Sequence, residues 1–223
     1  MVLVLFTITA VSALLVALVQ DVTKDAIAAA NLQAKNVAKF KVLNTSDAEA
    51  FVAADTTRVI GDFQISVSTV KRIADESIIG YAVEAPSITK NGYADRITLM
   101  VGFVEEGDKC VVNGVEVLSQ KETPGLGANM TKEGNSLERS IVGKDAADVK
   151  FSVTKEGGSF DALTGSTISS RAYANAIETA YAGYLWATGR LNTSEEALEA
   201  APTGASMLQQ NEPEAQKGEE CNE

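Results

Sequence analysis

The sequence predicts an α+β protein that begins with a single membrane-spanning helix. Three observations lead to this class. Residues 1–19 contain no charged side chain. Residues 61–119 hold several short runs in which apolar and polar side chains alternate, as in strands with one buried face. Residues 168–187 repeat apolar side chains every three or four positions, the pattern of an amphipathic helix. Because the predicted strands are joined by short turns, we expect an antiparallel sheet with flanking helices.

The N-terminal apolar run is long enough to cross a membrane. At ~1.5 Å per residue, residues 1–19 span about 30 Å, the thickness of a hydrocarbon core. The run ends at Gln20 and Asp21, where a charge becomes costly in lipid. A cleaved signal peptide would need a basic start and a nearby small-residue cleavage site. No basic residue precedes the run, and charged residues separate it from Ala28–Ala30. A retained helix over residues 1–20 is therefore favoured.

Residues 21–45 are predicted to be a helical linker, since they are rich in alanine and repeat apolar residues at helical spacing. Residues 46–190 form the folded domain. Residues 191–223 hold eight acidic residues against Lys217, which makes this stretch an acidic, largely disordered tail. Four lysines follow the apolar run within residues 21–45, and no basic residue precedes it. The positive-inside rule alone would therefore place the domain in the cytoplasm.

Four strands are predicted within the domain. They cover Phe63–Val67, Ile78–Val83, Ile97–Phe103 and Val111–Leu118. The cluster at residues 105–108 is typical of a turn and lies between the last two strands. Within the last strand, Asn113-Gly114 predicts either a bulge or a second turn. The helix over residues 168–187 turns one side toward the core. That side holds Ile168, Ala172, Ala176, Ile177, Ala180, Tyr181, Tyr184 and Leu185.

The composition excludes several kinds of chemistry. The chain has no histidine, so its own residues cannot build a Ser-His-Asp or Cys-His mechanism, or a His-ligated haem. Its two cysteines, Cys110 and Cys221, are far apart and show no metal-ligand spacing. The formal net charge of −11 leaves no basic surface for nucleic acid.

Two segments have the composition of ligand-binding loops. The first is Glu122-Thr123-Pro124-Gly125-Leu126-Gly127, in which proline fixes a turn and two glycines allow a backbone to approach a ligand closely. An ordinary loop after a strand is the alternative interpretation.

The second segment is Asp161-Ala162-Leu163-Thr164-Gly165-Ser166-Thr167, directly before the C-terminal helix. Five hydroxyl residues crowd this helix start, where free N–H groups and the helix dipole favour a phosphate. They are Thr164, Ser166, Thr167, Ser169 and Ser170. The alternative is simple capping, although one cap needs only one hydroxyl.

Together, the two segments resemble the FMN-binding domain family. The motif ETPGLG after a paired strand, followed by D-x-x-T/S-G-A/S-T before a helix, is similar to the G subunit of Rnf electron transport complexes. It is also similar to the C subunit of the sodium-pumping NADH:quinone reductase. The resemblance extends from the N-terminal helix to about Gly189 and includes the strands GYADRITLMVGF and NGVEVLSQKETPGLG.

The resemblance implies that FMN is attached through a phosphoester to the last threonine of the second motif, Thr167. Asp161 and Gly165 match that motif directly, whereas Ser166 stands where alanine is usual and Thr164 where serine is common. A flavin transferase outside the cytoplasm attaches FMN in this family, taking it from FAD. The 122–127 loop is expected to lie against the flavin or its phosphate. No metal and no catalytic acid or base are expected.

The resemblance also implies an electron-transfer subunit of a bacterial inner-membrane complex, with the flavin domain on the periplasmic or extracellular side. An Rnf-type complex couples ferredoxin:NAD oxidoreduction to sodium or proton export. The expected partners are the other subunits, the flavin transferase and the lipid bilayer; nucleic acid is not expected. The quinone-reductase subunit is the first alternative, and it usually runs longer than 223 residues. A membrane-anchored binding module without cofactor is the second.

Overall fold

The computed structural model describes residues 2–60, 63–88 and 97–190. The described chain divides after Ala38 into an N-terminal helical unit and a compact domain. The predicted acidic tail, residues 191–223, lies outside the described residues, as do residues 92–96 of the strand motif GYADRITLMVGF.

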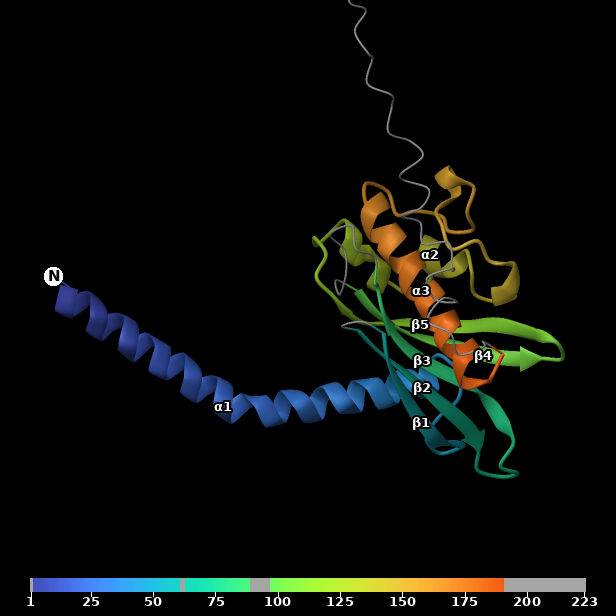
Figure 1. The fold of residues 1–223 in the computed structure, drawn as a ribbon, viewed down its shortest axis with the longest axis horizontal. Coiled ribbons are helices and arrows are strands. Elements are labelled where there is room, and N and C mark those ends of the chain that lie inside the picture. Colours follow the sequence, from blue (N-terminus) through green and yellow to red (C-terminus); the bar gives the residue numbers. More distant parts are fainter. Residues whose placement is uncertain (1, 61–62, 89–96, 191–223) are drawn as a thin grey trace, which may run out of the picture. The chain divides into compact units, whose positions relative to one another are not determined.

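The first unit is almost entirely helix. Helix α1 runs without a break from Val2 to Lys41, so the predicted spanning segment and most of the predicted linker are one element (Figure 1). Neither glycine nor proline interrupts this stretch, and alanine favours helix. The helical segment Val4–Lys41 contains an 18-residue stretch with a mean hydropathy of 2.0, none of which is buried, so its length and composition allow it to cross a membrane. A helix of 40 residues is about 60 Å long, roughly twice the hydrocarbon thickness.

The domain is built on a five-stranded antiparallel sheet in the order β1-β2-β3-β4-β5. Its strands are β1 Ala50–Ile60, β2 Phe63–Arg72, β3 Ile78–Pro86, β4 Ile97–Glu106 and β5 Lys109–Gln120. The last four confirm the predicted strands. Strand β1 was not predicted, because its side chains are mostly exposed and mostly lack apolar alternation.

The irregularity at Asn113 is a bulge. Val112 pairs with Phe103 and Gly114 pairs with Gly102, so Asn113 is the extra residue on β5. The alternative of a second turn at this position is wrong, since β5 continues to Gln120.

Helix α3, Thr167–Ala187, lies across one face of the sheet (Figure 1). It packs against β2, β3 and β4. Gly183 allows close contact, since a Cβ there would lie 2.8 Å from Ile65 Cγ2. The core between helix and sheet includes the fully buried Phe103 and Tyr184. One residue of the predicted helix face is wrong: Ile168 is 43% exposed, because it lies in the first turn, beyond the sheet.

The opposite face of the sheet holds the residues just after α1. A Cβ at Gly80 would lie 2.8 Å from Leu43 Cδ2, and a Cβ at Gly102 would collide with the Val42 carbonyl. The side-chain amide of Asn113 donates to the same Val42 oxygen at 2.8 Å. Glycines on neighbouring strands therefore leave a groove in which this segment is buried.

Short helices connect β5 to α3. They are η1 Gly127–Thr131, α2 Ser136–Arg139, η2 Ala146–Asp148 and η3 Thr154–Glu156. The two predicted binding segments lie at the ends of this connection, one between β5 and η1 and the other immediately before α3.

Candidate functional site

The structure brings the two predicted segments into contact at the first turn of α3. Glu122 Oε2 accepts a hydrogen bond from Ser169 Oγ at 2.6 Å. Gly127 packs against this pair: a Cβ there would lie 2.5 Å from Ser169 Oγ and 2.8 Å from Glu122 Oε2. Only glycine leaves room for the hydrogen bond between Glu122 and Ser169. This steric requirement explains why the second glycine of ETPGLG, Gly127, stands at this position.

The 122–127 loop has its own internal order. The Thr123 carbonyl accepts from the amides of Leu126 at 3.2 Å and Ala128 at 3.3 Å. Gly125 adopts φ +80°, which disfavours any residue with a side chain. Asn129 Nδ2 donates to the Gly125 carbonyl at 2.8 Å. The loop therefore presents a defined surface to α3.

The second segment forms a tight entry into α3. Gly165 adopts φ +74°, and a Cβ on it would lie 3.5 Å from Leu126 Cδ2, so Leu126 covers this turn. The Ser170 hydroxyl donates to the Ser166 carbonyl at 2.8 Å and accepts from the Leu163 amide at 3.0 Å. These bonds fix the backbone on both sides of Thr167.

The N-terminus of α3 has no side-chain cap. Ser166 is the N-cap residue, but its side chain makes no capping hydrogen bond. The interpretation of the hydroxyl cluster as simple capping is therefore wrong for Ser166. The first amides of a helix have no intrahelical partner and carry the positive end of the dipole. They suit a phosphate beside Thr167.

Thr167 is the first residue of α3 and is half-buried. Its hydroxyl has no hydrogen-bond partner among the residues that the structure describes. Two exposed apolar side chains lie near it in the fold, Leu126 at 47% and Ile168 at 43% exposure. A threonine hydroxyl, an uncapped helix end and an apolar margin together fit a phosphate ester that carries an aromatic ring system, such as FMN.

The predicted site residues differ in how far they are exposed to solvent. Glu122 and Thr167 are half-buried, whereas Gly127 and Ser166 are buried. The exposed ones are Thr123, Pro124, Gly125, Leu126, Asp161, Thr164 and Gly165. Asp161 contacts α2, because its carbonyl accepts from Ser136 Oγ at 2.9 Å. The sequence did not single out Ser136 or the pairing of Ser169 with Glu122.

The groups with strongly shifted pKa values lie away from this site. Burial raises the pKa of the Cys110 thiol to about 11 and the pKa of the Glu178 carboxyl to about 7. Glu178 lies on α3 three turns after Thr167. Within the described ranges, no cluster of three or more acidic or cysteine ligands could hold a metal ion.

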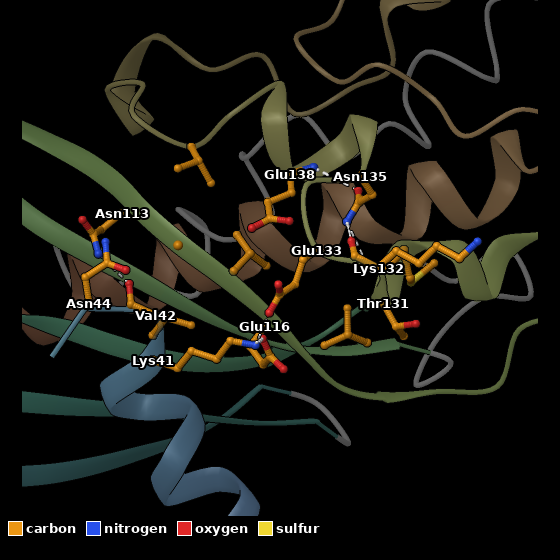
Figure 2. A pocket seen from close by; sticks show the side chains of 15 residues that line it. Lys41, Val42, Asn44, Asn113, Glu116, Thr131, Lys132, Glu133, Asn135 and Glu138 are labelled. Carbon is orange, nitrogen blue, oxygen red and sulfur yellow. Dashed lines mark hydrogen bonds and ion pairs between the residues drawn. The ribbon is translucent and has the colours of Figure 1, made fainter. Parts of the chain in front are cut away.

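A cavity of about 360 Å³ lies along β5, η1 and α2 (Figure 2). The Lys41 ammonium lies 2.7 Å from Glu116 and 3.4 Å from Glu133, and its hydrogen bond to Glu116 is the main reason that its pKa is raised. Met130, just after the 122–127 loop, forms part of the wall. Neither Thr167 nor the loop lines this cavity in the part of the chain that the structure describes.

Comparisons with known proteins agree with the geometry. The profile of the FMN-binding domain family matches residues 92–182, which include both segments. The G subunit of a Na⁺-translocating ferredoxin:NAD⁺ oxidoreductase complex from Acetobacterium woodii is 30% identical, over 78% of this chain and 86% of its own length. The G subunit of an ion-translocating oxidoreductase complex from Pseudomonas aeruginosa is also 30% identical, over 82% of this chain and 86% of its own. Another from Shewanella baltica is 39% identical over 105 residues, about half of each chain.

The fold and the site define a flavoprotein domain of the FMN-binding type, carried behind an apolar N-terminal helix that makes the chain a single-pass membrane protein. More particularly, the chain belongs to the family of G subunits of the ion-translocating oxidoreductase, or Rnf, complexes. This confirms the resemblance drawn from the two motifs and favours the Rnf protein over its quinone-reductase counterpart.

Proposed function

We propose that this chain is an electron-transfer subunit whose FMN is held covalently by a phosphoester on Thr167. The complex would couple ferredoxin:NAD oxidoreduction to translocation of sodium or protons; the name of the Acetobacterium relative gives Na⁺ translocation and ferredoxin:NAD⁺ oxidoreduction for the complex of that protein. The observation that carries the proposal is the position of Thr167 at the uncapped N-terminus of α3, directly after the Gly165 turn that Leu126 of the 122–127 loop covers.

The geometry supports attachment at Thr167 over its neighbours. Ser166 is only 6% exposed, and Ser169 and Ser170 are buried and hydrogen-bonded to other groups. Thr164 is exposed but lies before the Gly165 turn, outside the helix. Among the five hydroxyl residues, Thr167 alone combines a position in the first helical turn with a side chain that is only half-buried.

The attachment is a phosphoryl transfer. The Thr167 oxygen forms a bond to the flavin-side phosphorus of FAD, and the bond from that phosphorus to AMP breaks. The proton of the hydroxyl passes to a base of the flavin transferase, and AMP leaves. The chain itself has no histidine. If the base is an imidazole, it therefore belongs to the transferase.

Bound FMN supplies the one-electron chemistry that the side chains of this protein lack. The chain's own residues bind and orient it. The amides of the first turn of α3 would stabilise the phosphate, and the exposed Leu126 and Ile168 would offer apolar surface to the ring. Covalent attachment retains the cofactor where free FMN is scarce.

Helix α1 would anchor the protein in the lipid bilayer and contact other subunits there. Thr7 and Thr9 donate hydrogen bonds to carbonyls of their own helix, so these hydroxyls are satisfied without a neighbouring helix. Because the transferase acts outside the cytoplasm, the flavin domain would lie on the periplasmic or extracellular side. This places four lysines after the helix on the outer side, against the simple charge rule.

The proposal is tested by co-expressing the full chain with a flavin transferase and viewing the denatured protein in a gel under ultraviolet light. A fluorescent wild-type band that is lost in Thr167→Ala, and kept in Ser166→Ala, supports it. A dark wild-type band would refute covalent flavin and leave a membrane-anchored binding module as the better function.

A further inference from the structure

We infer that the hydrogen bond between Glu122 and Ser169 is a positioning contact that holds the 122–127 loop in place for flavin attachment at Thr167. The inference rests on the proposed function. It assigns to Glu122 and Ser169 a role in presenting the acceptor hydroxyl, without contact to the reacting atoms.

The contact is short, partly buried and sterically enforced. Ser169 Oγ donates to Glu122 Oε2 at 2.6 Å, within the range of a hydrogen bond to a charged acceptor. Ser169 is only 5% exposed. Gly127 fills the space beside both groups, so that even one added methyl would collide with them. The bond is therefore built into the packing between the loop and the helix.

The contact lies close to the acceptor along the chain. Ser169 is two residues after Thr167 in the first turn of α3, and Glu122 opens the loop whose Leu126 covers Gly165. The loop thus touches the helix start on both sides of Thr167. The Thr123 carbonyl accepts hydrogen bonds inside the loop and Asn129 Nδ2 donates another, so the loop should move as one piece when the contact is lost.

Loss of the contact should therefore expose the turn at Gly165 and misplace the loop beside Thr167. A transferase that recognises this surface would then attach flavin more slowly. A hydrogen bond to a charged group is typically worth enough to change such a rate about tenfold. If the contact only stabilised the fold, attachment to the folded protein would keep its rate.

The first measurement uses the full chain made without transferase, so that Thr167 is unmodified. Hydrogen exchange of the amides in residues 122–129 should speed up roughly tenfold in Ser169→Ala and in Glu122→Ala. Glu122→Gln retains a neutral acceptor oxygen and should speed exchange less than Glu122→Ala does. Ser140→Ala, which removes a buried hydroxyl that bonds within its own short helix, should leave this loop unchanged. Unchanged exchange in Ser169→Ala would overturn the inference.

The second measurement is the initial rate of flavin attachment, with purified transferase and FAD, on variants that circular dichroism shows to be folded. Ser169→Ala and Glu122→Ala should each slow attachment about tenfold, and the double variant should be slowed by much less than the product of the two effects, because the two side chains share one interaction. Rates equal to wild type, despite faster exchange, would show a purely structural contact and overturn the inference. A wild type that takes no flavin would refute the proposed function instead, while the exchange result would still stand.

Discussion

Substitution of Gly127 by alanine is a sharp test of how the two segments meet. The new Cβ would lie 2.5 Å from Ser169 Oγ, 2.8 Å from Glu122 Oε2 and 2.9 Å from Glu122 Cβ. These distances are below any normal contact, so the Glu122–Ser169 bond must open or the loop must shift. Loss of a hydrogen bond to a charged group costs about 1.5–3 kcal/mol. Added strain of about 1 kcal/mol or more gives an expected destabilisation of roughly 3–4 kcal/mol.

The assay is urea unfolding of the unmodified chain, followed by far-ultraviolet circular dichroism. Gly125→Ala is the matched control in the same loop. Gly125 has φ +80°, and a Cβ added there would meet no atom within 4 Å, so only backbone strain of about 1–2 kcal/mol is expected. If Gly127→Ala destabilises the protein no more than Gly125→Ala does, the tight packing of the loop on α3 is refuted.

Three further outcomes follow from the structure. Gly102→Ala should destabilise the domain by about 3 kcal/mol or more, because its Cβ collides with the Val42 carbonyl, whereas Gly107→Ala, in an open turn, should cost about 1–2 kcal/mol in urea unfolding. Burial raises the folded-state pKa of Glu178 to about 7, so its ionisation destabilises the fold as pH rises from about 4.5 to 7. Glu178→Gln should therefore stabilise the protein by up to about 3 kcal/mol at pH 8 and much less at pH 4.5, and an equal gain at both pH values would contradict this. Thr167→Ser keeps an acceptor hydroxyl and should still give a fluorescent band in a denaturing gel; a dark band would show that the threonine methyl group is required.

The sequence predicted the strands that carry apolar side chains at every second position. In β2 the buried Ile65 and Val67 face α3, whereas β4 is buried on both faces over most of its length. β1 escaped prediction because it is an edge strand with mostly exposed side chains, so no apolar period marks it. Residues 1–20 and 21–45 were predicted as a spanning helix and a separate helical linker, whereas α1 is continuous through most of both, because the charges that begin at Asp21 end the apolar run without ending the helix.

The two segments of the site could be predicted from the sequence, but the contact between them could not. Hydroxyls and glycines before a helix indicate an anion site on physical grounds. The contact of Glu122 with Ser169 joins residues 47 positions apart and depends on the path of the whole η1–η3 connection, which has no periodic pattern. Helical spacing alone places Ile168 on the apolar side of the helix, whereas the structure leaves it 43% exposed in the first turn of α3.

The most direct test of the central claim is to locate the modification by mass spectrometry. Trypsin should release residues 156–171, since Lys155 and Arg171 flank this stretch, and the peptide contains Thr164, Ser166, Thr167, Ser169 and Ser170. After co-expression with a flavin transferase, we expect this peptide to gain the mass of one FMN less one water, with fragment ions that place it on Thr167. An unmodified peptide, or FMN on Ser166, would contradict the account.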